Sequence, residues 1–218
     1  MKSPIRSLTL LAVALALAIG AATASVVAQV GKSITVTDAN AVPESELATY
    51  PHMTPAIAKA LVTKRPFMRI TDLNAFLLSQ GLTQAQATEF YGKAFVHINL
   101  NTATGEEILL VPNAGKRMVH EFDEYRPWKT YAQFAKEIGK YVGAEATAKL
   151  AQYTFIPVNA NSAADDVLMT IPGANEALVQ KVKAGRPYKT VADLEAALAK
   201  GSNATEARRV ARFFIVQP

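Results

Sequence analysis

The chain has 218 residues, half of them apolar, with 23 basic and 18 acidic residues and a net charge of +5. It contains no cysteine, which excludes disulfides, thiol catalysis and cysteine-ligated zinc sites. Roughly 190 residues remain after the N-terminal segment described next, enough to build a core by packing alone.

The first 28 residues have the pattern of a secretory signal peptide. Lys2 and Arg6 supply a basic start, and residues 8–19 form an almost unbroken apolar stretch. Small residues then allow cleavage after Ala24 or after Ala28. An uncleaved membrane anchor is the alternative, because weak apolarity continues a little further. We expect cleavage and an exported, periplasmic protein.

The rest of the chain repeats one unit three times at a spacing of 60 or 61 residues. A repeat of this length is stronger evidence for the architecture than the helix or strand propensity of any one segment. The spacing places three units near residues 34–95, 96–157 and 158–218. Three sets of anchors share it: Asn40, Asn101 and Asn161; Pro51, Pro112 and Pro172; Arg65-Pro66, Arg126-Pro127 and Arg186-Pro187.

Each repeat begins with a short extended segment, 96–100 in the second copy, followed by a helix start. Asn101-Thr102 offers a capping side chain, and Glu106 and Glu107 place carboxylates near the positive end of the helix dipole. Glu44 and Glu46 do the same in the first copy, and Asp165 and Asp166 in the third. Paired catalytic carboxylates are the alternative interpretation of these acids.

Three further helices follow in the second copy. After the apolar segment 108–111 and a tight turn, a helix runs to residue 125, where Arg126-Pro127 ends it because proline disfavours a helical residue before it. Helices at 131–139 and 144–153 complete the unit. The predicted fold is therefore all-α, with two helix–hairpin–helix elements in each of three units.

An aromatic residue follows each Arg-Pro pair: Phe67, Trp128 and Tyr188. Its fixed position between two helices favours a role as a core residue. A base-stacking platform for nucleic acid is the alternative.

The order of these motifs resembles the ComEA-type helix-hairpin-helix family. Residues 97–134 carry the strongest likeness, and the third and first copies extend it over the chain from about residue 34. The resemblance implies a SAM/HhH-like fold of three tandem units. It also implies sequence-independent binding of double-stranded DNA outside the cytoplasmic membrane, in DNA uptake or competence.

The family binds phosphate through a Gly-hydrophobic-Gly hairpin, whose amides face the anion. None of the six hairpins here keeps both glycines. The first hairpins are 52–54, 113–115 and 173–175, and the second are 81–83, 141–143 and 201–203. Asparagine tolerates the left-handed conformation, so we expect Asn113, Asn175 and Asn203 to preserve the turn.

Without the signal peptide, which contains Lys2 and Arg6, the chain has 21 basic and 18 acidic residues. The basic surplus is therefore modest. Lys116-Arg117 follows the second-copy hairpin, and Arg208 and Arg212 share a face of the last helix. Solvated helix faces are the alternative interpretation of both groups. The candidate phosphate-binding residues are Asn113, Ala114, Gly115, Lys116, Arg117, Gly173, Asn175, Arg208, Arg209 and Arg212.

The sequence gives no sign of an enzyme. His52, His97 and His120 occupy different repeat positions, and no catalytic triad, Walker-type phosphate loop or metal-ligand cluster is present. We expect no cofactor, no metal and no small-molecule substrate. The expected partner is double-stranded DNA. An unidentified periplasmic protein is the alternative, as in the extrinsic helix-hairpin-helix subunit of photosystem II, in which case the fold has lost DNA binding.

Overall fold

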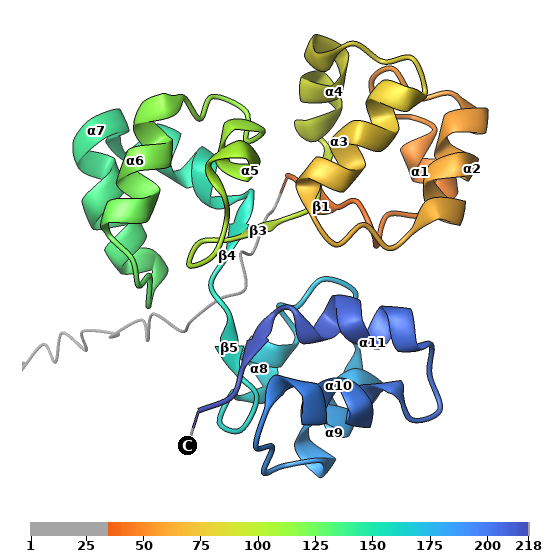
Figure 1. The fold of residues 1–218 in the computed structure, drawn as a ribbon, viewed down its shortest axis with the longest axis vertical. Helices are drawn as coiled ribbons and strands as arrows, with labels where there is room; N and C mark the ends of the chain where they lie inside the picture. The colour runs from red at the N-terminus through yellow and green to blue at the C-terminus, as the bar shows by residue number, and fades with distance from the viewer. Residues whose placement is uncertain (1–34, 218) are drawn as a thin grey trace, which may run out of the picture.

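The computed structural model describes residues 35–217, and the expected signal peptide lies outside them. This part of the chain is mainly helical, with one order of elements occurring three times along it (Figure 1). Each occurrence begins and ends with a two-residue strand, and the two strands pair in parallel. We call the segments from β1 to β2, β3 to β4 and β5 to β6 units 1, 2 and 3.

Unit 1 consists of β1 (Thr37–Asp38), α1 (Glu44–Leu47), α2 (Pro55–Lys64), α3 (Ile70–Ser79), α4 (Gln84–Tyr91) and β2 (Ala94–Phe95). Unit 2 consists of β3 (Ile98–Asn99), α5 (Gly105–Leu109), α6 (Lys116–Glu124), α7 (Tyr131–Ala151) and β4 (Thr154–Phe155). Unit 3 consists of β5 (Val158–Asn159), α8 (Asp165–Leu168), α9 (Glu176–Ala184), α10 (Val191–Ala199), α11 (Ala204–Ala211) and β6 (Phe214–Ile215).

Helix α7 covers both the third and the fourth helix expected in unit 2. The backbone leaves the helical conformation at Gly143, which has φ 78° and ψ 167°. Only glycine adopts such a conformation without steric cost. The two expected helices therefore meet at Gly143.

The expected helix cap at Asn101 was wrong, because Thr104 caps α5 and forms a capping box with Glu107. Asn101 instead clamps the segment after Arg-Pro: its Nδ2 donates to Trp128 O at 2.9 Å, and Trp128 N donates to its Oδ1 at 2.6 Å. Asn40 makes the same pair with Phe67, and Asn161 with Tyr188. This reciprocal bond explains the constant distance between asparagine and aromatic residue.

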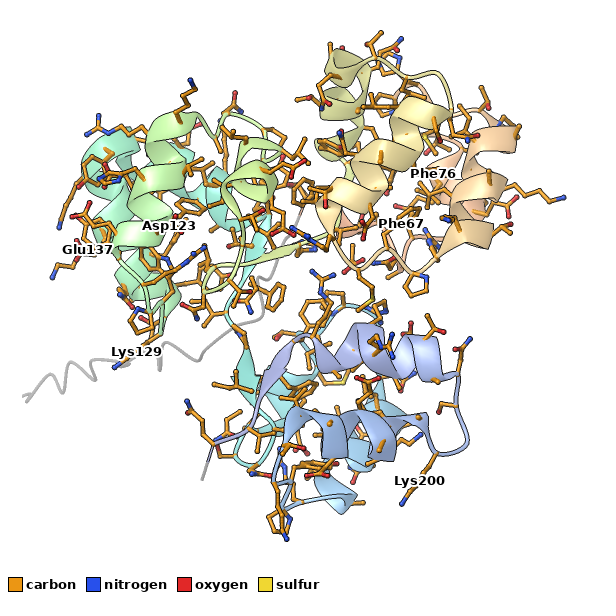
Figure 2. The ribbon with its side chains drawn as sticks, viewed as in Figure 1. Phe67, Phe76, Asp123, Lys129, Glu137 and Lys200 are labelled. Carbon is orange, nitrogen blue, oxygen red and sulfur yellow. The ribbon has the colours of Figure 1, made fainter. Side chains whose placement is uncertain are left out.

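The aromatic residues of the clamp are buried. Trp128 is 1% exposed, contacts Phe134 edge-on and donates from Nε1 to Phe122 O at 2.9 Å. In unit 1 the rings of Phe67 and Phe76 lie with their centroids 5.4 Å apart (Figure 2). The expectation of a core role is confirmed for this position.

The buried apolar side chains form two clusters. One runs through units 1 and 2, and the other lies within unit 3 and includes Phe155 at the end of unit 2. Units 1 and 2 thus share a core, while unit 3 has its own. Among residues 35–217, no helix is both long and apolar enough to span a bilayer.

Candidate nucleic-acid interface

The first hairpin of every unit turns through one left-handed residue. These residues are His52, Asn113 and Gly173, with φ of 61°, 66° and 81°. In unit 2 the next amide, Ala114 N, then donates back to Val111 O at 2.9 Å, and the other units repeat this bond. Histidine in unit 1 and asparagine in unit 2 thus hold the position that Gly173 holds in unit 3, and the turn is kept.

Asn175 and Asn203 were expected to take the left-handed conformation, and this expectation was wrong. Asn175 has φ −144° and caps α9, where its Oδ1 accepts from Leu178 N at 3.0 Å. Asn203 has φ −70° and caps α11 by accepting from Thr205 N. The left-handed residues of the second hairpins are glycines instead, namely Gly81, Gly143 and Gly201.

The helix after the first hairpin begins differently in the three units. Thr54 caps α2 through Ile57 N, and Pro55 removes a further amide. Asn175 caps α9, and Glu176 adds a carboxylate there. Helix α6 begins after Gly115, which has no side chain to cap it. The first amides of α6 therefore lack the side-chain partner that the other two helices have.

Two basic residues stand at this uncapped end of α6. Lys116 is exposed, and within the described part of the chain it makes no ion pair. The guanidinium of Arg117 lies 4.4 Å from the ring centroid of Tyr141, and its Nε lies 3.5 Å from Glu121 Oε1. Arg117 remains 63% exposed. Together with exposed Asn113 and Gly115, these residues form what we call the α6 hairpin surface.

The C-terminal arginines do not form the basic patch that the sequence suggested. Arg208 is exposed but pairs with Glu195 at 3.2 Å. The side chain of Arg209 is 3% exposed, pairs with Glu206 and donates to Pro172 O at 3.0 Å. Arg212 lies beyond the end of α11, largely buried, and donates to His97 O. All three guanidinium groups thus make internal contacts, and those of Arg209 and Arg212 are largely buried.

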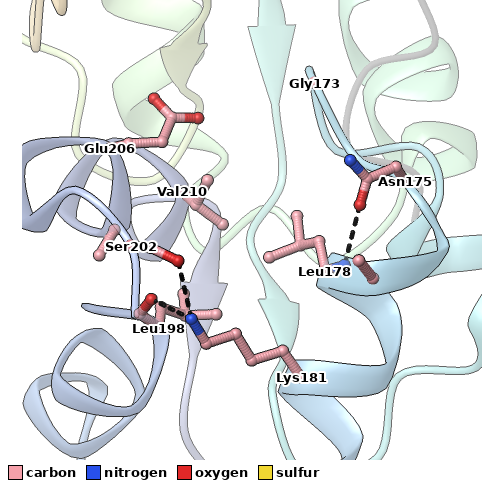
Figure 3. A pocket seen from close by; sticks show the side chains of 10 residues that line it. Gly173, Asn175, Leu178, Lys181, Leu198, Ser202, Glu206 and Val210 are labelled. Atoms are coloured by element: carbon pink, nitrogen blue, oxygen red, sulfur yellow. Dashed lines mark hydrogen bonds between the residues drawn. The ribbon is translucent and has the colours of Figure 1, made fainter. Parts of the chain in front are cut away.

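A lysine of α9 that the repeat pattern did not single out binds the second hairpin of unit 3. Lys181 Nζ donates to Leu198 O and Ser202 Oγ at 2.7 and 2.9 Å (Figure 3). It also donates to Lys200 O at 2.6 Å. It lines a cleft of about 380 Å³ that extends to Gly173 and Asn175. Because all three ammonium protons are engaged, this lysine holds α9 against the second hairpin and has no proton left for a ligand.

No group of three or more histidine, aspartate and glutamate side chains in residues 35–217 is arranged to hold a metal ion. The chain matches no family model. It also matches no curated protein and no solved structure.

Proposed function

We propose that this protein is an exported, non-enzymatic protein that binds the backbone of double-stranded DNA without sequence preference. Its three units are tandem helix-hairpin-helix pairs of the ComEA type, acting in DNA uptake or competence outside the cytoplasmic membrane. No cofactor or small-molecule substrate takes part. The α6 hairpin surface of unit 2 makes the principal contact with phosphate.

The observation that carries this proposal is the uncapped start of α6. Free amides at a helix N-terminus and the positive end of the helix dipole both favour an anion. Gly115 lets the phosphate approach closely, and no atom lies within 4 Å of the position that a Cβ there would occupy. Lys116 and Arg117 add positive charge at the same end.

Units 1 and 3 are weaker candidates for the same contact. Their corresponding helices already satisfy an amide through Thr54 and Asn175. Glu176 would also repel a phosphate at the start of α9. Binding therefore depends mainly on unit 2.

A protein-interaction or structural role is the second candidate. The burial of Arg209 and Arg212 favours it, because guanidinium groups that duplex DNA could use are engaged inside the molecule.

Fluorescence anisotropy with two labelled duplexes of equal length and unrelated sequence separates the two candidates. The proposal predicts similar affinities for both duplexes, decreasing as salt concentration rises because bound counterions are released. Absence of binding by the wild-type protein at low salt would favour the protein-interaction role. A strong preference for one duplex would contradict backbone recognition.

A further inference from the structure

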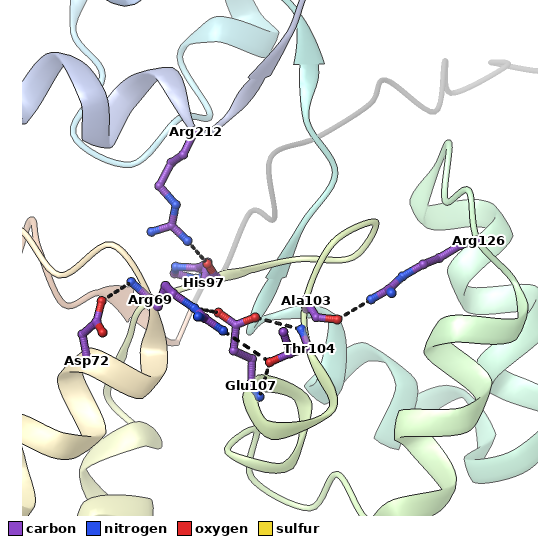
Figure 4. Close-up of polar contacts among 8 residues, drawn as sticks. All are labelled: Arg69, Asp72, His97, Ala103, Thr104, Glu107, Arg126 and Arg212. Carbon is purple, nitrogen blue, oxygen red and sulfur yellow. Dashed lines mark hydrogen bonds and ion pairs between the residues drawn. The ribbon is translucent and has the colours of Figure 1, made fainter.

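A buried carboxylate lies where unit 1, the connector between units 1 and 2, and unit 3 meet. Asp38, at the end of β1, is 4% exposed, and its Oδ2 lies 3.8 Å from Nδ1 of His97, which is 3% exposed. His97 belongs to the connector between units 1 and 2, and Arg212 of unit 3 donates to its carbonyl oxygen (Figure 4). Residues of all three parts therefore converge at this point.

Positive charge surrounds Asp38. Burial alone would raise the pKa of its carboxyl group, but the interactions with His97, Arg209 and Arg212 outweigh burial and lower that pKa. Arg65 of unit 1 also interacts electrostatically with Asp38. We call these five residues the Asp38 junction. Two other acids also act on these arginines: Glu206 pairs with Arg209, and Glu107, which pairs with Arg69, interacts electrostatically with Arg212.

The local turn does not require the charge of Asp38. Its Oδ1 accepts from the amide of Asn40 at 2.7 Å. The same turns in units 2 and 3 use Asn99 and Asn159, whose Oδ1 atoms accept from the equivalent amides at 2.9 and 3.1 Å. Asparagine therefore suffices for the turn, and the second carboxylate oxygen of Asp38 is free to act at the junction.

Arg65 of unit 1 also departs from the repeat, because its hydrogen bonds differ from those of the equivalent arginines. Arg126 donates to two backbone carbonyl oxygens of its own unit, at 2.8 and 2.6 Å, and Arg186 does the same at 2.7 Å each. Arg65, at the same repeat position, leaves its buried Nε and Nη2 without hydrogen bonds. Arg209 Nη1 and Arg212 Nη1 are also buried without hydrogen bonds. All three arginines interact electrostatically with Asp38, whose negative charge compensates part of theirs.

The core of unit 3 is separate from the core that units 1 and 2 share, except that Phe155 of unit 2 packs in it, with its ring centroid 4.6 Å from that of Phe213. Unit 3 is therefore attached to unit 2 through Phe155 and the connector 156–157, and to unit 1 through the Asp38 junction. An uncompensated buried charge is far more costly than an uncompensated exposed one.

We propose that Asp38 is the docking charge that holds unit 3 against unit 1, and that loss of this charge releases unit 3 to move about the connector 156–157. Docked, Arg212 donates to the carbonyl oxygen of His97, and both Arg209 and Arg212 interact with the charge of Asp38. Released, their guanidinium groups regain water.

Asp38→Asn tests the proposal, since it removes the charge and keeps the hydrogen bond that Asn99 and Asn159 make. The chain has no cysteine, so Lys64→Cys and Lys200→Cys place spin labels on exposed sites of units 1 and 3. In the full chain, Asp38→Asn is expected to shift the interlabel distance beyond the width of the docked distribution. Asp166→Asn, at an exposed carboxylate of unit 3, is the matched control and should leave the distance unchanged.

Arg212→Gln provides a second approach from unit 3 and should lengthen the same distance. Circular dichroism shows whether each variant keeps its helices. Two folded variants with the distance distribution of the unsubstituted protein would overturn the proposal. If Asp38→Asn fails to fold, the Arg212→Gln measurement decides.

Discussion

One asparagine in each unit holds the chain that follows the second helix. Asn101 exchanges two hydrogen bonds with the backbone of Trp128 and thereby positions its indole in the core. The ring then packs against Phe134 and Tyr125, and its Nε1 is satisfied by Phe122 O. With its ring in these contacts and only 1% exposed, Trp128 is a core residue and has no face available for a base.

Replacing this side chain tests its role. Trp128→Ala should cost roughly 3–5 kcal/mol of unfolding free energy, because it removes a large buried ring and leaves a cavity. Trp128→Phe, which keeps an aromatic ring, should cost less. Denaturant titration followed by circular dichroism measures both. An unchanged unfolding midpoint in Trp128→Ala, accompanied by loss of DNA binding, would instead make it a stacking residue.

At the scale of the element, the start of a helix determines what it can bind. Gly115 has an extended backbone, φ −93° and ψ −179°, that any residue can adopt. A serine there would reproduce the cap that Thr54 and Asn175 supply in the other units. Its hydroxyl would accept from an amide that the proposal assigns to phosphate.

Gly115→Ser should therefore stabilise the protein by a few tenths of a kcal/mol, about the difference between glycine and serine caps. The same change should weaken duplex binding about two- to tenfold, the value of one hydrogen bond. Thermal unfolding and anisotropy measure the two effects. Stability and affinity that rise together would contradict the assignment of these amides.

Helix α5 contributes a pH-dependent contact between units 1 and 2. Burial tends to raise the pKa of Glu107, but the hydrogen bonds from Arg69 and from the Thr104 backbone outweigh it, so the pKa is lowered. Arg69 Nε lies 3.0 Å from Glu107 Oε1. A lowered pKa means that the stabilisation is present above the unfolded-state pKa and is lost as pH falls through the folded-state value.

Glu107→Gln should lower the unfolding free energy by about 1–2 kcal/mol at pH 7. The difference from wild type should shrink as pH falls below about 4, where the wild-type carboxylate also takes up its proton. Glu106→Gln, at an exposed neighbouring position, is the matched control and should have little effect. A difference independent of pH would show that charge is not the cause.

At the scale of the whole molecule, the repeat predicted the order of helices and the buried aromatic position. It could not predict that Asn101 clamps the chain instead of capping α5, because both roles suit asparagine before a helix. Arg209 and Arg212 looked like a basic surface because helical spacing describes one helix alone. Their burial arises from contacts with Pro172 and His97, which are distant in sequence.

The candidate site was partly predictable, because part of it is formed by residues that are close together in the sequence. The hairpin of unit 2 is local, so Asn113 and Gly115 could be placed from sequence, and the left-handed conformation of Asn113 is confirmed. The exposure of Lys116 and the contact of Arg117 with Tyr141 depend on how the second hairpin packs beside the first. No pattern in the sequence contains that information.

Salt titration of duplex binding by Lys116→Ala/Arg117→Ala tests the central claim most directly. Each phosphate contact contributes about one unit to the slope of log affinity against log salt, so the double variant should lose up to about two units of slope and bind every duplex less tightly. Lys129→Ala/Lys189→Ala removes the same charge from exposed positions outside the hairpins and should leave the slope nearly unchanged. Equal loss of slope in the two double variants would contradict phosphate binding at the α6 hairpin surface.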